Sequence, residues 1–437
     1  MHVHLIDVAP KPRRKMSFQT LSLPRVAGAT PPDIRVSITD GRVERIRIDR
    51  SADLVGMTFS CNNAPRAYEL AREHRRLGIP VVAGGVHATA VPQEVLGHFD
   101  AVLTGEAEGG AWEHLLRDHA EGRLEGVYRN QQPPDIAGLN PPRIDLFRHR
   151  RRYLDFHPIE ATRGCTHDCS FCFNATIHGP KFRTRPVEEV VEDARGAPTR
   201  NLMFMDDNLC GKPGYAKRLF EALIPLKKRL FFQTHLLMAA DLELMDLAAR
   251  AGTRFVFVGI ESVEDGSLAA VNKAWNRVSD YRTYIQRFHD RGIFVSGGLI
   301  LGLDKDTPET FSKTLRYMDE IGLDNAAVNM LIPYPGTPMW HQMRNEGRLL
   351  TEDYTRYTGL DPVVQPAGMS LEELQDGYDR VLQEFYRPRN YVRRMVRNRM
   401  TGRWYLYPVA WFREPRRSRM LRLGHVLNRR GGDRRAA

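Results

Sequence analysis

The chain has 437 residues, of which 42% are hydrophobic and 27% are charged, a composition typical of a globular protein with room for two or three domains. No run of about 18 uncharged apolar residues occurs, so we predict no transmembrane helix. The N-terminal stretch MHVHLIDVAP lacks the basic start and the small-residue cleavage site of a signal peptide. We therefore expect a cytoplasmic protein, whose thiols stay reduced.

The net charge of +11 is concentrated at the C-terminal end of the chain. From Arg387 onward, sixteen arginines stand against two acids, a charge of about +14, so that residues 1–386 carry +11 less +14, or −3. Aromatic residues are interleaved with these arginines. Such a tail is typical of a solvated segment, of contact with an anionic membrane surface, or of phosphate binding. We leave these alternatives open, including association with the inner membrane surface.

The first 125 residues alternate between strand and helix patterns. Strands are predicted at 2–8, 53–60, 79–85 and 100–106, and helices at 64–78, 92–99 and 107–120. This alternation predicts an α/β domain with a doubly wound parallel sheet, Rossmann-like or flavodoxin-like, over residues 1–128. Ligands of such sheets bind beyond the carboxyl ends of the strands, which here are Thr58–Ser60, Gly84–Thr89 and Thr104–Glu106.

A second alternating series follows residues 129–155, which are rich in Pro, Asn and Arg and are predicted to form a linker. Strands are predicted at 158–163, 201–207, 230–236, 254–262, 294–302 and 326–334, with helices at 186–195, 215–226, 241–252, 279–292 and 307–322. Six successive β/α units predict a partial (β/α)6 barrel over 156–345, with its active site in the carboxyl-end loops. Residues 346–437 form a C-terminal region with a predicted helix at 370–386 and the basic tail.

Three of the five cysteines, Cys165, Cys169 and Cys172, lie within eight positions, in the loop after the first strand of the second series. Three thiolates can hold three irons of a four-iron cluster and leave the fourth iron open to a small chelating ligand. A structural zinc ion is the alternative. Zinc needs a fourth protein ligand, which His167 or His178 would supply, but no second Cys-x2-Cys pair follows.

The spacing Cys-x3-Cys-x-aromatic-Cys, with Phe171 as the aromatic residue, resembles the radical SAM superfamily. The resemblance implies a [4Fe-4S] cluster held by the three cysteines. It also implies S-adenosylmethionine (SAM) bound to the open iron. One-electron reduction then cleaves SAM to a 5′-deoxyadenosyl radical, while the protein orients the reactants and excludes water. The electron would come from an external donor of the flavodoxin or ferredoxin type.

Further residues extend this resemblance to the SAM site. The stretches that carry it are FMDDN at 204–208, GIES at 259–262 and GLILGLD at 298–304. The implied SAM contacts are Phe171, Asp206, Asp207, Glu261, Gly298, Ile300 and Gly302. The two aspartates would meet the methionine amine, although one of them is expected only to cap a helix. Glu261 would contact the ribose or the amine, because an acid at the end of an apolar strand needs a partner.

The N-terminal stretch from LVGMTFS to DAVLTGEAE, with Asn272–Lys273 and PYPGTP at 333–338, resembles B12-binding radical SAM proteins. The resemblance implies that residues 1–128 bind cobalamin. The implied contacts are Thr58, Ser60, Gly84, Gly85, His87, Thr89, Gly105 and Glu106. The cobalt-binding motif Asp-x-His-x-x-Gly does not occur, so the lower cobalt ligand stays open. His87 and Cys61 lie at predicted strand ends, where a buried structural role is an alternative for each.

The resemblance favours cobalamin-dependent methylation of an unactivated carbon of a small molecule, with two molecules of SAM as methyl donor and radical source. A cobalamin-dependent oxidative cyclase, or another redox enzyme with the same cofactors, is the runner-up. A nucleic-acid-binding protein with a structural metal is an alternative of another class, although we do not expect nucleic acid as a partner. Methylthiotransferases need a second three-cysteine cluster. Only two of the five cysteines lie outside the first cluster, so this class of enzyme is excluded. No motif identifies the substrate or the oligomeric state; an apolar substrate would suit a membrane-surface tail.

Overall fold

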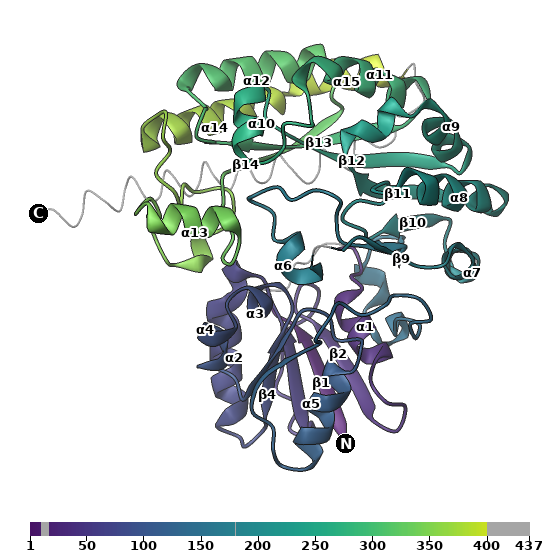
Figure 1. The fold of residues 1–437 in the computed structure, drawn as a ribbon, viewed down its shortest axis with the longest axis vertical. Helices are drawn as coiled ribbons and strands as arrows, with labels where there is room; N and C mark the ends of the chain where they lie inside the picture. The colour runs from purple at the N-terminus through teal and green to yellow at the C-terminus, as the bar shows by residue number, and fades with distance from the viewer. Residues whose placement is uncertain (10–16, 180, 400–437) are drawn as a thin grey trace, which may run out of the picture. The chain divides into compact units, whose positions relative to one another are not determined.

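The computed structural model describes residues 1–9, 17–179 and 181–399, and these form two compact units (Figure 1). The first unit comprises Met1–Gln233, Pro333–Gly347 and Thr351–Thr358. The second unit comprises Thr234–Ile332, Arg348–Leu350 and the chain from Gly359 onward. Because the division after Gln233 falls within the predicted barrel segment 156–345, the domain boundaries drawn from the sequence stay a prediction.

The first unit begins with a sheet of six parallel strands. They are β1 (His2–Asp7), β2 (Arg35–Asp40), β3 (Leu54–Thr58), β4 (Val81–Gly84), β5 (Ala101–Thr104) and β6 (Gly126–Arg129). The strand order is β2-β1-β3-β4-β5-β6, and its first five strands follow the flavodoxin-like order. The predicted doubly wound domain is therefore confirmed, with two edge strands, β2 and β6, that the sequence patterns did not indicate.

Helices cover both faces of this sheet. On one face pack α2 (Ala64–Arg75), α3 (Val86–Ala90) and α4 (Pro92–Leu96), and on the other pack α1 (Ser22–Gly28) and α5 (Ala111–Ala120). Since neither face meets water, the central strands are continuous apolar runs rather than alternating ones. Val81, Val82 and Ala83 of β4 are all buried, for example, with Val82 directed to one core and its neighbours to the other.

The segment 129–155, predicted to be a linker, packs against the first sheet. Phe147 and Tyr153 are buried in the core cluster on the α1 face, and the Tyr153 hydroxyl donates a hydrogen bond to Asp40 at 2.9 Å. Backbone pairing of Ser17 with Tyr153 adds a further attachment. The Pro-rich composition indicated an irregular segment, and the aromatic residues within it supply the apolar area that anchors it.

The second β/α series begins in the first unit. Its strands and helices there are β7 (His157–Ile159), β8 (Thr162–Arg163), α6 (Asn174–His178), β9 (Arg183–Thr184), α7 (Val187–Gly196), β10 (Asn201–Phe204), α8 (Pro213–Leu223), β11 (Arg229–Thr234) and, later in the chain, α13 (Pro338–Asn345). Strand β10 pairs in parallel with β7 and with β11. Strands β8 and β9 form a short antiparallel hairpin whose connection carries the three clustered cysteines.

The series continues in the second unit with three parallel strands, β12 (Thr253–Glu261), β13 (Phe294–Leu301) and β14 (Asn325–Met330). Its helices are α9 (Leu242–Arg250), α10 (Asp265–Ala270), α11 (Tyr281–Asp290), α12 (Pro308–Glu320), α14 (Leu371–Phe385) and α15 (Pro388–Arg399). Each of the six predicted barrel strands is present, and the C-terminal region is helical as predicted. No helix among the described residues is long and apolar enough to cross a membrane. The basic tail beyond Arg399 lies outside the described residues.

Candidate active site

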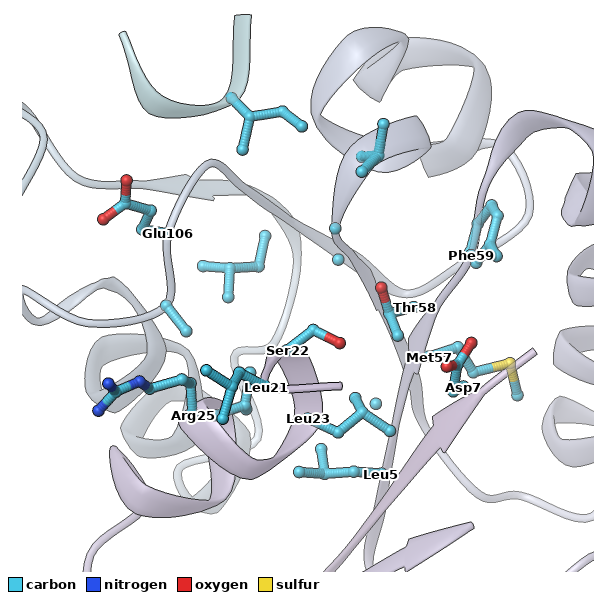
Figure 2. Close-up of a pocket in the computed structure, with 18 of the residues that line it drawn as sticks. Leu5, Asp7, Leu21, Ser22, Leu23, Arg25, Met57, Thr58, Phe59 and Glu106 are labelled. Carbon is cyan, nitrogen blue, oxygen red and sulfur yellow. The ribbon is translucent and has the colours of Figure 1, made fainter. Parts of the chain in front are cut away.

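A cavity of about 530 Å³ lies within the first unit at the carboxyl ends of β1, β3, β4 and β5 (Figure 2). Residues implied to bind cobalamin line it: Thr58, Ser60, Gly84, Gly85, Gly105 and Glu106. Figure 2 shows Leu5, Leu21 and Leu23 gathered in one part of the cavity and Glu106 in another. The cavity thus combines an apolar wall with a polar one, as sites for organic cofactors do.

The cavity also reaches the segment that carries the cysteines. Phe173, Ile177 and His178 of the cysteine loop and α6 line it, and so does Asp207 after β10. One cavity within the first unit is therefore bordered both by the six-stranded parallel sheet and by the cysteine loop. At Gly84 an added Cβ would make only ordinary van der Waals contact, 3.7 Å from the carbonyl oxygen of Leu103. These features fit part of a bulky cofactor at the sheet edge.

His87 and Thr89, also implied to bind cobalamin, do not line this cavity. His87 is 1% exposed and its ring lies 5.7 Å from that of Phe59 and 5.1 Å from that of Tyr354. Its Nε2 is 3.2 Å from the Tyr68 hydroxyl. Thr89 accepts a hydrogen bond from the backbone N–H of Gly105 at 2.8 Å. The positions of both side chains favour structural roles.

The three cysteines occupy the connection between β8 and β9, and all three are half-buried. Gly164 directs the chain into this loop with φ of +89°, at a place where a Cβ would lie 2.9 Å from the carbonyl oxygen of Lys181. The Cys172 N–H donates to the Cys169 carbonyl at 3.0 Å, and Asn208 Nδ2 donates to Cys165 Sγ at 3.6 Å. Phe171 is half-buried between the last two cysteines.

Three thiols in one loop suit the ligand set of an iron–sulfur cluster. Burial, with a smaller contribution from the neighbouring cysteines, raises the pKa of Cys172 to about 11, so a cationic partner is needed to hold this thiolate. No three metal-binding side chains of the described residues converge on one point. The thiolates of a four-iron cluster bind different irons and need no such convergence. His178, a proposed zinc ligand, is instead bound to Glu106 at 2.8 Å.

The two aspartates of FMDDN have different surroundings. Asp206 is buried and accepts hydrogen bonds from the Ala161 N–H at 3.1 Å, from the Thr162 N–H and from the Thr162 hydroxyl at 2.7 Å. Burial raises its pKa to about 7. Asp206 therefore fixes the backbone that leads into the cysteine loop. Asp207 lines the cavity, and its carboxylate lies 3.5 Å from Nε2 of His178.

The sequence patterns did not reveal a charge cluster, which we call the Glu106 cluster, beside the cysteine loop. It consists of Glu106, Glu108, Glu160, Arg163, His178 and Arg183. Arg163 binds Glu106 at 2.7 Å, Glu108 at 2.7 Å and Glu160 at 2.9 Å, while Arg183 binds Glu106 at 2.9 Å.

Glu106 is the centre of this cluster, and its side chain is only 6% exposed. Burial alone would raise its pKa, but hydrogen bonds from Arg183 and His178 and the charge of Arg163 hold that pKa well below the usual range. The carboxylate is thus bound to the two ends of the cysteine loop, and the residue also lines the cavity. The one sequence signal was that Arg163 and Arg183 bracket the loop.

In the second unit, the residues implied to bind SAM meet at the carboxyl ends of β12 and β13. Glu261 pairs in register with Leu299, which stands between Gly298 and Ile300. Gly302 turns the chain after β13 with φ of +90°. The Glu261 carboxylate binds the ammonium of Lys273 at 2.7 Å, a partner not assigned from the sequence. The unit therefore places Glu261 beside the glycine-containing strand.

Comparisons with known proteins match three family models. The radical SAM superfamily matches residues 159–318, a B12 binding domain matches 26–113, and a domain of unknown function (DUF4070) matches 337–432.

One curated relative is the bacteriochlorophyllide d C-12(1)-methyltransferase of Chlorobaculum tepidum. It is 28% identical, over 81% of this chain and 79% of the relative. Another is the anaerobic magnesium-protoporphyrin IX monomethyl ester cyclase of Cereibacter sphaeroides, 25% identical over 70% of this chain and 55% of the relative.

The fold is shared with a solved structure of the radical SAM methyltransferase TsrM from Kitasatospora setae, with cobalamin and a [4Fe-4S] cluster bound. The TM-score is 0.65 at 18% identity, covering 87% of this chain and 85% of that one. The family matches and the relatives agree with the cysteine loop, the parallel sheets and the cavity described above. The chain is therefore an enzyme of the B12-binding branch of the radical SAM superfamily, with a [4Fe-4S] cluster, SAM and cobalamin as its cofactors.

Proposed function

We propose that the enzyme methylates an unactivated carbon of an apolar small molecule. The observation that carries this proposal is the cavity of the first unit, which is bordered both by the strand ends of the B12 binding domain and by the cysteine loop. Methyl transfer to a carbon radical needs the methyl donor and the radical source to be close together. The substrate class is suggested by the relative that acts on bacteriochlorophyllide d.

In this proposal each group of residues has a separate task. Cys165, Cys169 and Cys172 hold the cluster. Phe171, Asp207, Glu261, Gly298, Ile300 and Gly302 contact SAM, and Asp206 positions the loop. Thr58, Ser60, Gly84, Gly85 and Gly105 face cobalamin. When bound, the cluster and cobalamin supply an electron that cleaves SAM and a methyl group for transfer. The apolar wall of the cavity, including Leu5 and Leu23, excludes water from these groups.

The proposal is tested by identifying the products formed from SAM. The protein is reconstituted anaerobically with iron, sulfide and hydroxocobalamin, and receives SAM, a strong reductant and candidate tetrapyrrole substrates. We expect both 5′-deoxyadenosine and S-adenosylhomocysteine in the mass spectrum, together with a product heavier by one methyl group. Omitting cobalamin should abolish S-adenosylhomocysteine. Turnover of a tetrapyrrole that yields 5′-deoxyadenosine without S-adenosylhomocysteine would contradict methylation.

The second candidate is an oxidative cyclase, which the similarity to magnesium-protoporphyrin IX monomethyl ester cyclase favours. A cyclase consumes SAM only as a radical source, so the same assay separates the two functions.

For either reaction we propose an external one-electron carrier of the flavodoxin or ferredoxin type as a partner. A membrane-surface role of the basic tail from Arg387 onward also stays a proposal; it predicts that truncation after about residue 387 abolishes co-sedimentation with anionic vesicles.

His87 offers a further prediction about the residues that would bind cobalt. Because its ring is enclosed by Phe59, Tyr68 and Tyr354 and does not line the cavity, His87→Ala should leave the cobalt ligand set unchanged. The measurement is electron paramagnetic resonance of one-electron-reduced cobalamin bound to the protein. We expect the same nitrogen splitting pattern in the wild type and the variant. Loss of a nitrogen splitting in His87→Ala would identify this residue as the ligand.

A further inference from the structure

We propose that an arginine-rich surface of the first unit is the docking site of the electron carrier, and that the carrier is an acidic flavoprotein of the flavodoxin type. The inference rests on the proposed function, which requires an external one-electron carrier. What is new is the place where the carrier binds and the charge it must bring. The surface, which we call the arginine patch, consists of Arg45, Arg47, Arg50, Arg148, Arg150, Arg151 and Arg152.

Two segments that are distant in the sequence form this patch. They are residues 43–50, which follow the edge strand β2, and residues 148–152. The His149 ring joins them, because its Nε2 lies 3.1 Å from the Glu44 carboxylate. The guanidinium of Arg152 also donates a hydrogen bond to a backbone carbonyl of the first segment. The arginines of both segments therefore belong to one surface.

Buried neighbours fix the patch to the body of the unit. Phe147 and Tyr153, on either side of the second segment, lie in the core on the α1 face of the sheet. Ile46 and Ile48 of the first segment pack against the core on the other face. All seven arginines between these anchors are exposed. The apolar residues thus hold the backbone, and the charges are left in water.

The positive charge of the patch is not compensated locally. No carboxylate of a described residue forms an ion pair with any of the seven arginines. The two acids of the segments have other partners, since Glu44 binds His149 and Asp49 accepts a hydrogen bond from the Ser51 hydroxyl at 2.7 Å. Seven arginines and two acids give +5. Because residues 1–386 carry −3, the remainder of them carries −3 less +5, or −8.

The patch adjoins the cavity at which the cofactors are proposed to bind. Arg42, directly before the first segment, lines that cavity and lies 3.2 Å from Asp7, which lines it too. Asp40 binds the Arg42 guanidinium at 2.5 Å and accepts a hydrogen bond from Tyr153 at 2.9 Å. A carrier seated on the arginine patch would therefore lie beside the wall of the cavity.

The surroundings of the arginines favour an acidic protein as the partner. The structure describes all of 43–50 and 147–153, and no large apolar side chain of these segments is exposed. Surfaces that bind anionic membranes also offer apolar groups to the interface, and single-stranded nucleic acid is bound by exposed aromatic rings on which the bases stack. The patch offers charge alone, which suits the electrostatic attraction of an oppositely charged protein.

One electron passes in each encounter. The anionic flavin hydroquinone of the carrier loses it and becomes the neutral semiquinone. The acceptor in the test below is bound aquacobalamin, in which Co(III) becomes Co(II) and the water ligand is released. Atoms and charge balance without a further reactant.

The test measures this step by anaerobic stopped flow, with flavodoxin hydroquinone and the aquacobalamin-loaded holoenzyme. The patch variant carries Arg47→Glu, Arg148→Glu and Arg151→Glu. We expect its second-order rate constant to fall by at least about tenfold at about 10 mM salt. At about 1 M salt, where charges are screened within about 3 Å, the rates of variant and wild type should be similar. Lysine at the same three positions should retain most of the wild-type rate.

The matched control carries Arg72→Glu, Arg76→Glu and Arg117→Glu, the same change of net charge on exposed arginines of the first unit outside the patch. Its rate should fall far less. Photoreduced deazariboflavin, a small uncharged reductant, should reduce the cobalamin of all variants equally. Should the patch variant fail to fold, glutamine at the three positions removes the charge without reversing it and should give an intermediate rate.

An unchanged flavodoxin rate in the patch variant, or an equal fall in the control, would overturn the docking inference. So would loss of binding to single-stranded RNA or to anionic vesicles with the flavodoxin rate retained, which would assign the patch to that partner. A fall with deazariboflavin as well would place the defect in the cofactor site, with the same consequence. Failure of the wild type to retain cobalamin would instead refute the proposed function.

Discussion

The triple variant Cys165→Ala, Cys169→Ala, Cys172→Ala is expected to contain no iron and to lack the brown absorbance of the anaerobically prepared wild type. The three thiols lie in one loop between β8 and β9, and each supplies the ligand of one iron in the proposed cluster. Alanine offers no ligand, so the loss should be complete rather than partial. Iron and sulfide content and the visible spectrum are the measurements.

Cys61→Ala is the matched control for this experiment. Cys61 is buried in the first unit but lies outside the cysteine loop, so its removal should leave the iron content unchanged. Circular dichroism of both variants checks that the α/β fold is retained. Retention of stoichiometric iron by the triple variant would contradict the assignment of the cluster to this loop.

Glu106→Ala is expected to have the second-largest effect. The carboxylate is nearly excluded from water and binds Arg163, Arg183 and His178. Removing it leaves buried positive charge without one of its partners, for which about 3 kcal/mol of destabilisation is typical. Since Arg163 and Arg183 flank the cysteine loop, the variant should also lose iron faster to a chelator. Denaturant unfolding followed by circular dichroism and the rate of iron release are the measurements.

The control for Glu106 is Glu113→Ala, which removes an exposed acid on α5 of the same unit. An exposed carboxylate of this kind contributes little to stability, so the unfolding midpoint should move only slightly. Glu106→Gln keeps the shape without the charge and should fall between the two. If Glu106→Ala unfolded and released iron as the Glu113→Ala variant does, the Glu106 cluster could not be what holds the cysteine loop.

Much of the fold was predictable because nearly all residues of the long buried strands are apolar. The runs 254–262 and 294–302 appear as β12 and β13 almost within their predicted bounds. Strands β2 and β6 were missed because both lie at sheet edges, where half of the strand faces solvent and polar residues such as those of RVSITD are tolerated. The packing of 129–155 was missed because its few aromatic anchors stand among prolines.

The cysteine loop was predictable because the spacing of its ligands is local in sequence. The roles of Asp206 and Asp207 were not, because consecutive residues at a strand end point in different directions, and only the structure shows which one lines the cavity. Glu106 binds partners 57 and 77 residues away in sequence. No local pattern carries such a pairing, so the sequence could place Glu106 at a strand end but could not identify what it binds.

We propose that the cluster and cobalamin occupy one region of the first unit, at the cavity shared by the sheet edge and the cysteine loop. Electron paramagnetic resonance of the doubly loaded protein tests it most directly, with the cluster and the cobalt both brought to paramagnetic states. Singly loaded samples give the two reference spectra. We expect each signal to be broadened or split by the other centre in the doubly loaded sample. A spectrum equal to the sum of the two references would mean that the centres are far apart, and would contradict it.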